Sequence, residues 1–346
     1  LESYLLLLGV VALIIGLSFG IIITSVLICF LILLILWLRE DYMHRHAAID
    51  LYMKNSTAVC EIPDINDGFI PQGIAYDPDA DKLLITGYMG GLGASPIYVI
   101  DIAAGNADKI LMLTDGGRKF TGHAGGISVF NGVAYVAGST DGCMYGFSLR
   151  DIYGSEKSEG LMPDRIIDLK HEDEKIRVSF TAADDKLLYA GEFHKAPLFP
   201  THSSHRVEYN GVTQKAYLLG FTPSADGSAV PACVYSIPDN VQGACFDDGY
   251  LFLSQTDRFL SSRILTYKLD SLPEGDTKEV LGVEVPMYCL TEGSASKVTY
   301  IPAMSEEIIA VDGSLYILYE SASNRYRIGK GGGFDSVLST PLSYFK

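Results

Sequence analysis

Several motifs that mark common active sites are missing from this sequence of 346 residues. It contains no Gly-x-Ser-x-Gly, no glycine-rich phosphate loop and no His-Glu-x-x-His, so the familiar serine-hydrolase, nucleotide-binding and zinc-protease mechanisms have no motif here. None of the six cysteines forms a Cys-x-x-Cys pair, which argues against a zinc site of that type. Five of them follow the apolar N-terminus, and this odd number favours buried thiols over a complete disulfide framework.

Basic residues are also scarce. The chain has 26 lysines and arginines against 42 aspartates and glutamates, which gives a net charge of −16. A surface with this balance repels the phosphates of DNA and RNA. The composition therefore predicts no nucleic acid partner.

What the chain does contain is a recurring strand–turn–strand pattern. The clearest copy covers 241–269, where Asp248-Gly249 is a hairpin dipeptide between two runs rich in β-formers. The copies recur roughly every fifty to sixty residues, a period typical of a radial array of antiparallel sheets. We predict an all-β fold, a β-propeller over residues 58–346 with five visible blades, and the length is compatible with six.

The two ends of the array complete the expected ring. A short β-rich run, Ala58–Ile62, precedes the first copy, and the last copy lacks a fourth strand of its own. Pairing these ends would remove two exposed edges. The third strand of the last copy is expected at 326–328, and 196–213 is expected to be a long loop over one face.

Charge is absent from Leu5 to Leu38, a run longer than the ~20 residues that cross a bilayer core. It is too long for a signal peptide and no small-residue cleavage site follows it. We expect an N-terminal transmembrane helix within residues 1–38, either as one tilted span or as a hairpin that turns at 16–20. Trp37, the only tryptophan, would lie at the membrane interface.

Residues 39–57 are predicted to form a helical stalk or linker. Arg39, Arg45 and Lys54 favour a cytoplasmic position for this flank. Anchored bacterial propellers mostly lie outside the membrane, and this analogy points the other way. We expect a membrane-anchored protein with an extracytoplasmic propeller.

The geometry of a blade predicts where polar side chains gather. The loop that enters the first strand and the loop that leaves the second strand share one face of a propeller. The residues at these two places are expected to ring one mouth of the central channel, as a ligand site. They are Gln72, His123, Ser179, Gln242 and Glu306 on entry, and Tyr88, Ser139, Glu192, Gln255 and Glu320 on exit.

Two kinds of chemistry are available to this ring. Neutral His123 would serve as a general base or a metal ligand. Because neighbouring residues of a strand face opposite ways, only Glu306, and not Glu307, is expected to face the channel. Together with Glu192 and Glu320 it would suit Ca²⁺ or another divalent cation, which takes oxygen ligands.

Alternatively, these acidic residues have a structural role and bind no metal, and their carboxylates pair with Arg258, Arg325 or backbone amides. His202-x-x-His205 lacks a third ligand in the sequence and is expected on a surface loop. Glycines at the strand starts would serve close packing at the axis.

The strand starts carry a resemblance. Pro71–Asp77, His123–Val129 and Val241–Ala244 resemble those of bacterial secreted propellers of the gluconolactonase, strictosidine-synthase-like and NHL-repeat group. The resemblance spans about Ile62 to Ile328. It implies a propeller fold, and for the gluconolactonase type a divalent metal held in the channel by Glu, Asn and Asp. Glu306 matches the acid of that set, whereas its asparagines have no counterpart here.

Two classes of function follow from these expectations. The first is a membrane-tethered propeller that binds a small molecule, a sugar or a peptide at the channel mouth. Its ligand-binding residues would be Gln72, Tyr88, Glu192, Gln242, Gln255 and Glu320. The second is a metal-dependent hydrolase of the lactonase or esterase type, in which His123 and Glu306 would be catalytic.

Overall fold

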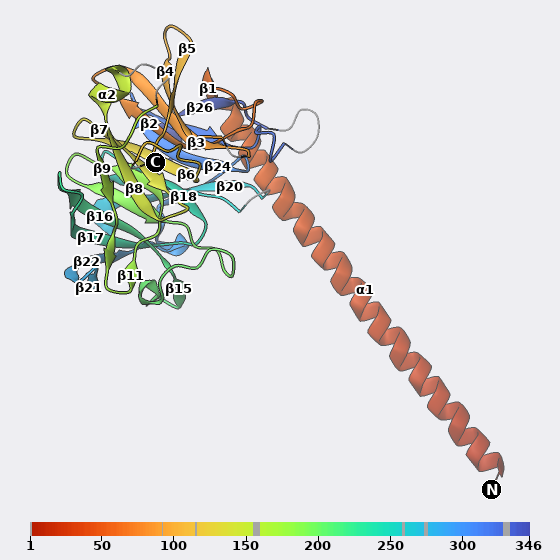
Figure 1. Cartoon of the computed structure of the whole chain (residues 1–346). Coiled ribbons are helices and arrows are strands. Elements are labelled where there is room, and N and C mark those ends of the chain that lie inside the picture. Colours follow the sequence, from red (N-terminus) through yellow and green to blue (C-terminus); the bar gives the residue numbers. More distant parts are fainter. Residues whose placement is uncertain are drawn as a thin grey trace. The chain divides into compact units, whose positions relative to one another are not determined.

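A computed structural model of the chain describes residues 2–91, 93–114, 116–154, 160–257, 260–272, 276–327 and 333–346. They form two units, 1–51 and 52–346. The first is nearly all of α1 (Glu2–Lys54), one unbroken helix (Figure 1). Because the helix continues through 16–20, the hairpin alternative is wrong. The described residues include no helix that is both long and apolar enough to cross a bilayer.

The second unit is a five-bladed propeller. Blade 1 is β2 (Phe69–Asp77), β3 (Lys82–Met89), β4 (Pro96–Asp101) and β5 (Asn106–Leu111). Blade 2 is β6 (Ala124–Phe130), β7 (Val133–Gly138), β8 (Cys143–Ser148) and β9 (Arg165–Ile167). Blade 3 is β12 (Val178–Ala183), β13 (Leu188–Glu192), β16 (Ala216–Pro223) and β17 (Ala229–Ile237). Blade 4 is β18 (Val241–Asp247), β19 (Tyr250–Gln255), β20 (Ser262–Lys268) and β23 (Lys297–Ile301). Blade 5 is β24 (Ser305–Val311), β25 (Ser314–Tyr319), β26 (Ser336–Pro341) and β1 (Thr57–Glu61).

Short elements decorate the blades. The hairpin β21 (Thr277–Val280) and β22 (Val283–Cys289) leaves blade 4 and extends blade 3, where β22 runs parallel to β17. This link between neighbouring blades was not predicted. The remaining elements are β10 (Lys170–His171), β11 (Glu174–Lys175), β14 (Val207–Tyr209), β15 (Val212–Gln214), α2 (Leu149–Gly154), η1 (Ser203–His205), η2 (Leu269–Ser271), η3 (Glu292–Ser294) and η4 (Leu342–Tyr344).

The predicted hairpin dipeptides form the turns between first and second strands. Asp248 and Gly249 have φ of 45° and 76°, and Asp312 and Gly313 have 46° and 75°. Two consecutive positive φ values match the right-handed twist of the flanking strands, and aspartate followed by glycine tolerates them best. The five copies seen in the sequence are therefore the five blades, and the expectation of strands on both sides of each turn is confirmed.

Every innermost strand carries an irregularity in its pairing near its start. The register shifts lie at Pro71/Gly73, Ala124/Ile127, Val178/Phe180, Val241/Gly243 and Ser305/Ile308. A bulge places two residues opposite one and re-aims the side chain at that point. Four of these shifts enclose a residue expected in the polar ring, namely Gln72, Ser179, Gln242 or Glu306, and His123 directly precedes the fifth.

The ring closes as predicted, with β1 beside the final blade. Thr57 lies opposite Ser339 and Glu61 opposite Ser336 in an antiparallel ladder. The expected third strand at 326–328 is wrong, because β26 takes that place and Tyr326 lies in a turn. Ile328 lies outside the described residues.

The last turn of α1 belongs to the propeller core. Tyr52 is 0% exposed, and its hydroxyl lies 3.1 Å from that of Tyr319. One turn later, Ser56 Oγ donates to the Tyr52 carbonyl at 2.8 Å and lies 2.7 Å from Thr340 Oγ1. Tyr52 is therefore part of the propeller core, although it lies in the helix that precedes the first strand.

Three truncations test how the ring closes. The protein without residues 1–51 should have the highest melting temperature of the three, because this truncation leaves Tyr52 and β1 in place. Removal of 1–54 also deletes buried Tyr52 and should cost about 3 kcal/mol of unfolding free energy, which lowers the melting temperature by several degrees. Removal of 1–62 deletes β1 and should cost more. Equal melting temperatures for the first and third truncations would contradict a closing role for β1.

Candidate functional site

His123 and Gln72 meet at the mouth where the inner strands begin. His123 Nε2 lies 2.5 Å from Gln72 Oε1. The Gln72 amide nitrogen donates to the Pro71 carbonyl at 2.8 Å and to Glu320 Oε2 at 2.9 Å, which fixes the orientation of the amide. Because Oε1 only accepts hydrogen bonds, His123 Nε2 carries the proton and Nδ1 keeps the lone pair of the neutral ring.

Burial keeps that ring neutral. It lowers the pKa of His123 to about 4, and the nearby charge of Arg325 acts in the same direction. At neutral pH the imidazole is thus an acceptor at Nδ1 and a donor at Nε2. This is the state that a general base or a neutral binding group requires.

Glu320 and Glu306 form a hydrogen-bonded carboxyl pair beside Gln72. Gln242 Nε2 donates to Glu306 Oε1 at 3.4 Å on the far side of the pair. Burial raises the pKa of Glu320 to about 8, and burial together with the charge of Glu320 raises the pKa of Glu306 well above its usual range. The pair therefore holds a proton at neutral pH, because two adjacent carboxylates cannot both ionise cheaply.

The expectation that Glu307 faces away from the channel is wrong. The bulge between Ser305 and Ile308 breaks the alternation of β24, so both glutamates point inward. Glu307 Oε2 accepts the backbone N–H groups of Ile74 at 2.9 Å and Ile127 at 2.7 Å, and Oε1 accepts that of Thr181 at 3.2 Å. Burial raises the pKa of Glu307, and these three donors oppose the shift.

The carboxylate of Glu307 fits at the axis because the strands beside it begin with glycine. A Cβ on Gly126 would lie 2.1 Å from Glu307 Oε1. A Cβ on Gly73 would lie 2.6 Å from the Gly125 carbonyl oxygen of the next blade. The predicted packing role of these glycines is therefore confirmed.

An aromatic and cationic group lies over the polar ring. The rings of Tyr88 and His123 are 4.2 Å apart, and Arg325 Nη1 donates to the Tyr88 hydroxyl at 2.7 Å. The guanidinium also lies 5.3 Å from the ring of Tyr326. The ring contacts of Arg325 and Tyr326 were not predicted. The turn-forming Ser321–Asn324 just before them was the signal that this segment leaves the sheet.

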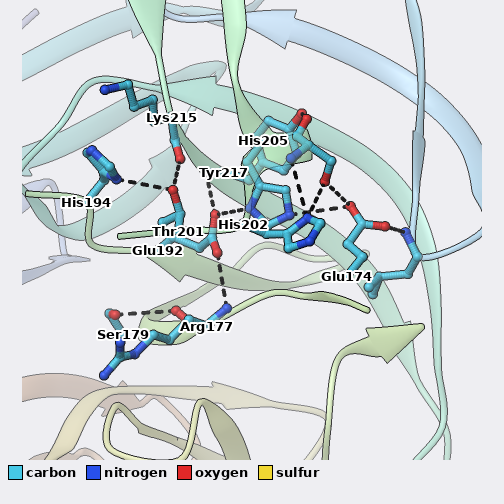
Figure 2. Close-up of polar contacts among 12 residues, drawn as sticks. Glu174, Arg177, Ser179, Glu192, His194, Thr201, His202, His205, Lys215 and Tyr217 are labelled. Carbon is cyan, nitrogen blue, oxygen red and sulfur yellow. Dashed lines mark hydrogen bonds and ion pairs between the residues drawn. The ribbon is translucent and has the colours of Figure 1, made fainter. Parts of the chain in front are cut away.

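Glu192 lies in a different place from Glu306 and Glu320. Its Oε2 accepts Tyr217 N–H at 3.1 Å and lies 2.8 Å from His205 Nδ1, while Oε1 accepts Arg177 N–H at 3.1 Å (Figure 2). All its oxygens thus have partners inside blade 3. The three acids expected to share a cation are not brought together, and the described part of the chain contains no group of three His, Cys, Asp or Glu side chains that could hold a metal ion.

Other expected ring residues also have local partners. Gln255 Oε1 accepts Arg263 Nη2 at 2.7 Å. Ser139 Oγ donates to the Ser179 carbonyl at 3.2 Å, between blades 2 and 3. Arg258, a candidate partner of the acids, lies outside the described residues.

The expectation that His205 lies on a surface loop is wrong. Its side chain is 0% exposed and stacks on Tyr217 with ring centres 4.5 Å apart. Its Nδ1 faces Glu192, and Nε2 lies 3.3 Å from Glu174 Oε1 (Figure 2). The insertion around it folds back because β14 and β15 form a hairpin, whose three-residue strands are too short to stand out in the sequence.

A second hollow lies at the other end of the channel. This cavity of about 760 Å³ is lined by the hairpin turns, including Asp184, Asp248 and Asp312, and it reaches Glu307. The two mouths thus differ: one is hollow and acidic, and the other carries the neutral histidine and the protonated pair. Groups with displaced pKa values mark functional sites more specifically than volume does, so we take the second as the candidate site.

Fold and site together define a five-bladed propeller with a buried polar ring at one mouth. No protein-family model and no curated protein sequence matches this chain. Among solved structures, the PQQ-bound aldose sugar dehydrogenase of Streptomyces coelicolor is 16% identical, with 82% of this chain and 96% of that chain covered and a TM-score of 0.46. Glutaminyl cyclase of Myxococcus xanthus is 12% identical, with 83% and 94% covered and a TM-score of 0.40. A nidogen/laminin complex shows 12% identity over 73% of each chain with a TM-score of 0.38. With TM-scores below 0.5, these similarities do not support any inference about the activity of this chain.

The carboxyl pair predicts a pH dependence of stability. A raised pKa in the folded state means that folding takes up a proton once the unfolded glutamate has lost its own. Stability should therefore fall as pH rises from about 5 to 8, by about 1.4 kcal/mol per pH unit for each proton taken up. The double variant Glu306→Gln/Glu320→Gln should flatten this part of the profile, measured by urea unfolding. Glu208→Gln, at an exposed position, is the matched control. If the parent protein, the double variant and the control all show the same dependence of stability on pH, the carboxyl pair does not take up a proton on folding.

Proposed function

We propose that this chain is a membrane-tethered propeller that binds a small polar ligand at the ring mouth. The observation that carries the proposal is the convergence of neutral His123 with the protonated Glu306–Glu320 pair through Gln72. The pair with its shared proton keeps one negative charge, which faces the guanidinium of Arg325, so the mouth as a whole offers donors and acceptors without net charge. A neutral ligand rich in hydroxyl groups, such as a sugar, suits it best.

The residues around the pair support this ligand class. Gln72 and Gln242 can exchange their hydrogen bonds to the acids for bonds to hydroxyl groups. Tyr88 and Tyr326 add aromatic surface, which commonly packs against the apolar face of a sugar ring. Ligand entry requires neighbouring side chains such as Tyr326 to move, because Glu306 is only 2% exposed.

A hydrolase remains the second candidate, on one specific observation. His123 Nδ1 is a free lone pair on one side of Gln72, and the pair is a proton donor on the other. A base and an acid on either side of one amide side chain could supply the two proton transfers of lactone or ester hydrolysis. A divalent cation at this mouth would have to displace the shared proton, with only two of the three expected carboxylates present.

A ligand panel tests the binding proposal. Thermal shifts of the full chain in detergent against mono- and oligosaccharides should reveal stabilisation by mass action. His123→Ala should weaken the response at least tenfold in apparent Kd, because it removes both a partner and the anchor of Gln72. Asp312→Asn at the opposite mouth is the control. If the thermal shift caused by a saccharide is lost only in Asp312→Asn, the ligand binds at the hollow mouth instead. If the protein hydrolyses lactones and chelators abolish that activity, the metal-dependent hydrolase is favoured.

The membrane tether is a separate part of the proposal. It is supported by the uncharged run Leu5–Leu38, all within α1. The chain should stay in the membrane fraction through high salt and alkaline carbonate, since burial in lipid does not depend on ionic attraction. Recovery in the soluble fraction without detergent would rule the tether out. Protease added to intact cells should digest an extracytoplasmic propeller, and full protection would place it inside.

A further inference from the structure

A second polar cluster lies between blades 3 and 4, apart from the ring pair. His194 follows β13 and its residue is 4% exposed. Asp239 and Asn240 form the turn that leads into β18. The Asn240 N–H donates to the His194 carbonyl at 3.0 Å, and this bond ties the two segments together.

The hydrogen bonds around His194 settle where its proton lies. The Thr201 hydroxyl donates its one hydrogen to the Lys215 carbonyl (Figure 2). Thr201 Oγ1 must therefore accept in its 3.1 Å contact with His194 Nδ1. Nδ1 is the protonated nitrogen, and in the neutral ring Nε2 carries the lone pair.

That lone pair faces other acceptors. His194 Nε2 lies 3.9 Å from Asp239 Oδ2, too far for a hydrogen bond. His194 Nε2, Asp239 Oδ1 and Asn240 Oδ1 are all buried and make no hydrogen bond to any residue in the described ranges. Buried acceptors without a donor cost free energy, and three from two adjacent segments call for a cation.

The turn that carries Asp239 is open to solvent on one side. Asn240 has a φ of 64°, a left-handed conformation that asparagine tolerates better than most residues. The Asp239 side chain is still 43% exposed, which leaves a path from solvent.

We propose that His194, Asp239 and Asn240 bind a divalent transition-metal ion, with Zn²⁺ the best fit. An imidazole nitrogen combined with carboxylate and amide oxygens suits a borderline metal, whereas Ca²⁺ and Mg²⁺ take oxygen ligands throughout. Thr201 orients the imidazole from behind, as a hydrogen-bond acceptor for the other ring nitrogen. Three protein donors leave the fourth position of a tetrahedral ion open to water.

The site lies beside the ring mouth and does not depend on the ligand proposed there. Gln255, one of the residues expected at that mouth, donates from Nε2 to the Asp239 carbonyl at 2.8 Å. Asp239 also precedes Gln242, which bonds Glu306 at the ring mouth, by three residues.

Calorimetric titration of the full chain in detergent with Zn²⁺ alone, after chelator treatment and dialysis, tests the proposal. One ion per chain should bind. His194→Ala and Asp239→Asn should each raise the Kd at least tenfold, and Thr201→Val about tenfold through the orientation of the ring. His202→Ala is the matched control, because His202 also lies near an aspartate, 3.8 Å from Asp173, in the same insertion.

The outcomes separate the alternatives. No binding of Zn²⁺ by the parent protein would overturn the site, and so would loss in His202→Ala with His194→Ala unchanged. Tighter binding of Ca²⁺ than of Zn²⁺ would overturn the role of the imidazole. Co²⁺ substitution provides a second measurement: visible bands of a low-symmetry N/O site should appear in the parent and vanish in Asp239→Asn. Unchanged melting of the metal-free variants confirms that folding is intact.

Discussion

One buried carboxylate fixes the geometry of the channel. Glu307 of blade 5 accepts backbone N–H groups from the inner strands of blades 1, 2 and 3. Those donors are free for Glu307 because β2, β6 and β12 each pair with a single neighbouring strand, so alternate N–H groups point to the axis. A side chain that bonds three separate sheets at the axis sets their approach, and glycine is needed wherever a Cβ would enter the same space.

The chemistry of the ring mouth follows from that arrangement. The bulge in β24 turns Glu306 and Glu307 inward together, one toward the mouth and one along the axis. Glu306 then meets Glu320 in a site screened from water, and proximity forces the two acids to keep a proton. Gln72 carries this polarity to His123 in the next blade. A neutral histidine and a carboxyl pair whose remaining charge faces Arg325 are what the fold presents there, and this is why a polar, uncharged ligand fits best.

The sequence predicted repeats well and side-chain direction poorly. Hairpin dipeptides such as Asp248-Gly249 have a local cause, so the blades, their turns and the closing strand could be found from the chain alone. A bulge has no such local signature, and the strict alternation of a strand therefore gave the wrong direction for Glu307. Glu192 was placed at the mouth by repeat position, but the folded insertion supplies His205 as its partner. The contacts of Arg325 likewise depend on a turn that only the three-dimensional structure defines.

The central claim is that Glu307 holds three blades at the axis, and hydrogen exchange tests it most directly. In Glu307→Gln, the amide group replaces one acceptor oxygen, and the backbone N–H groups of Ile74, Ile127 and Thr181 compete for the other. The account predicts that peptides containing these three amides, from three different blades, lose protection together while the outer strands keep theirs. Unchanged protection at all three amides, or a loss confined to the blade of the substitution, would contradict it.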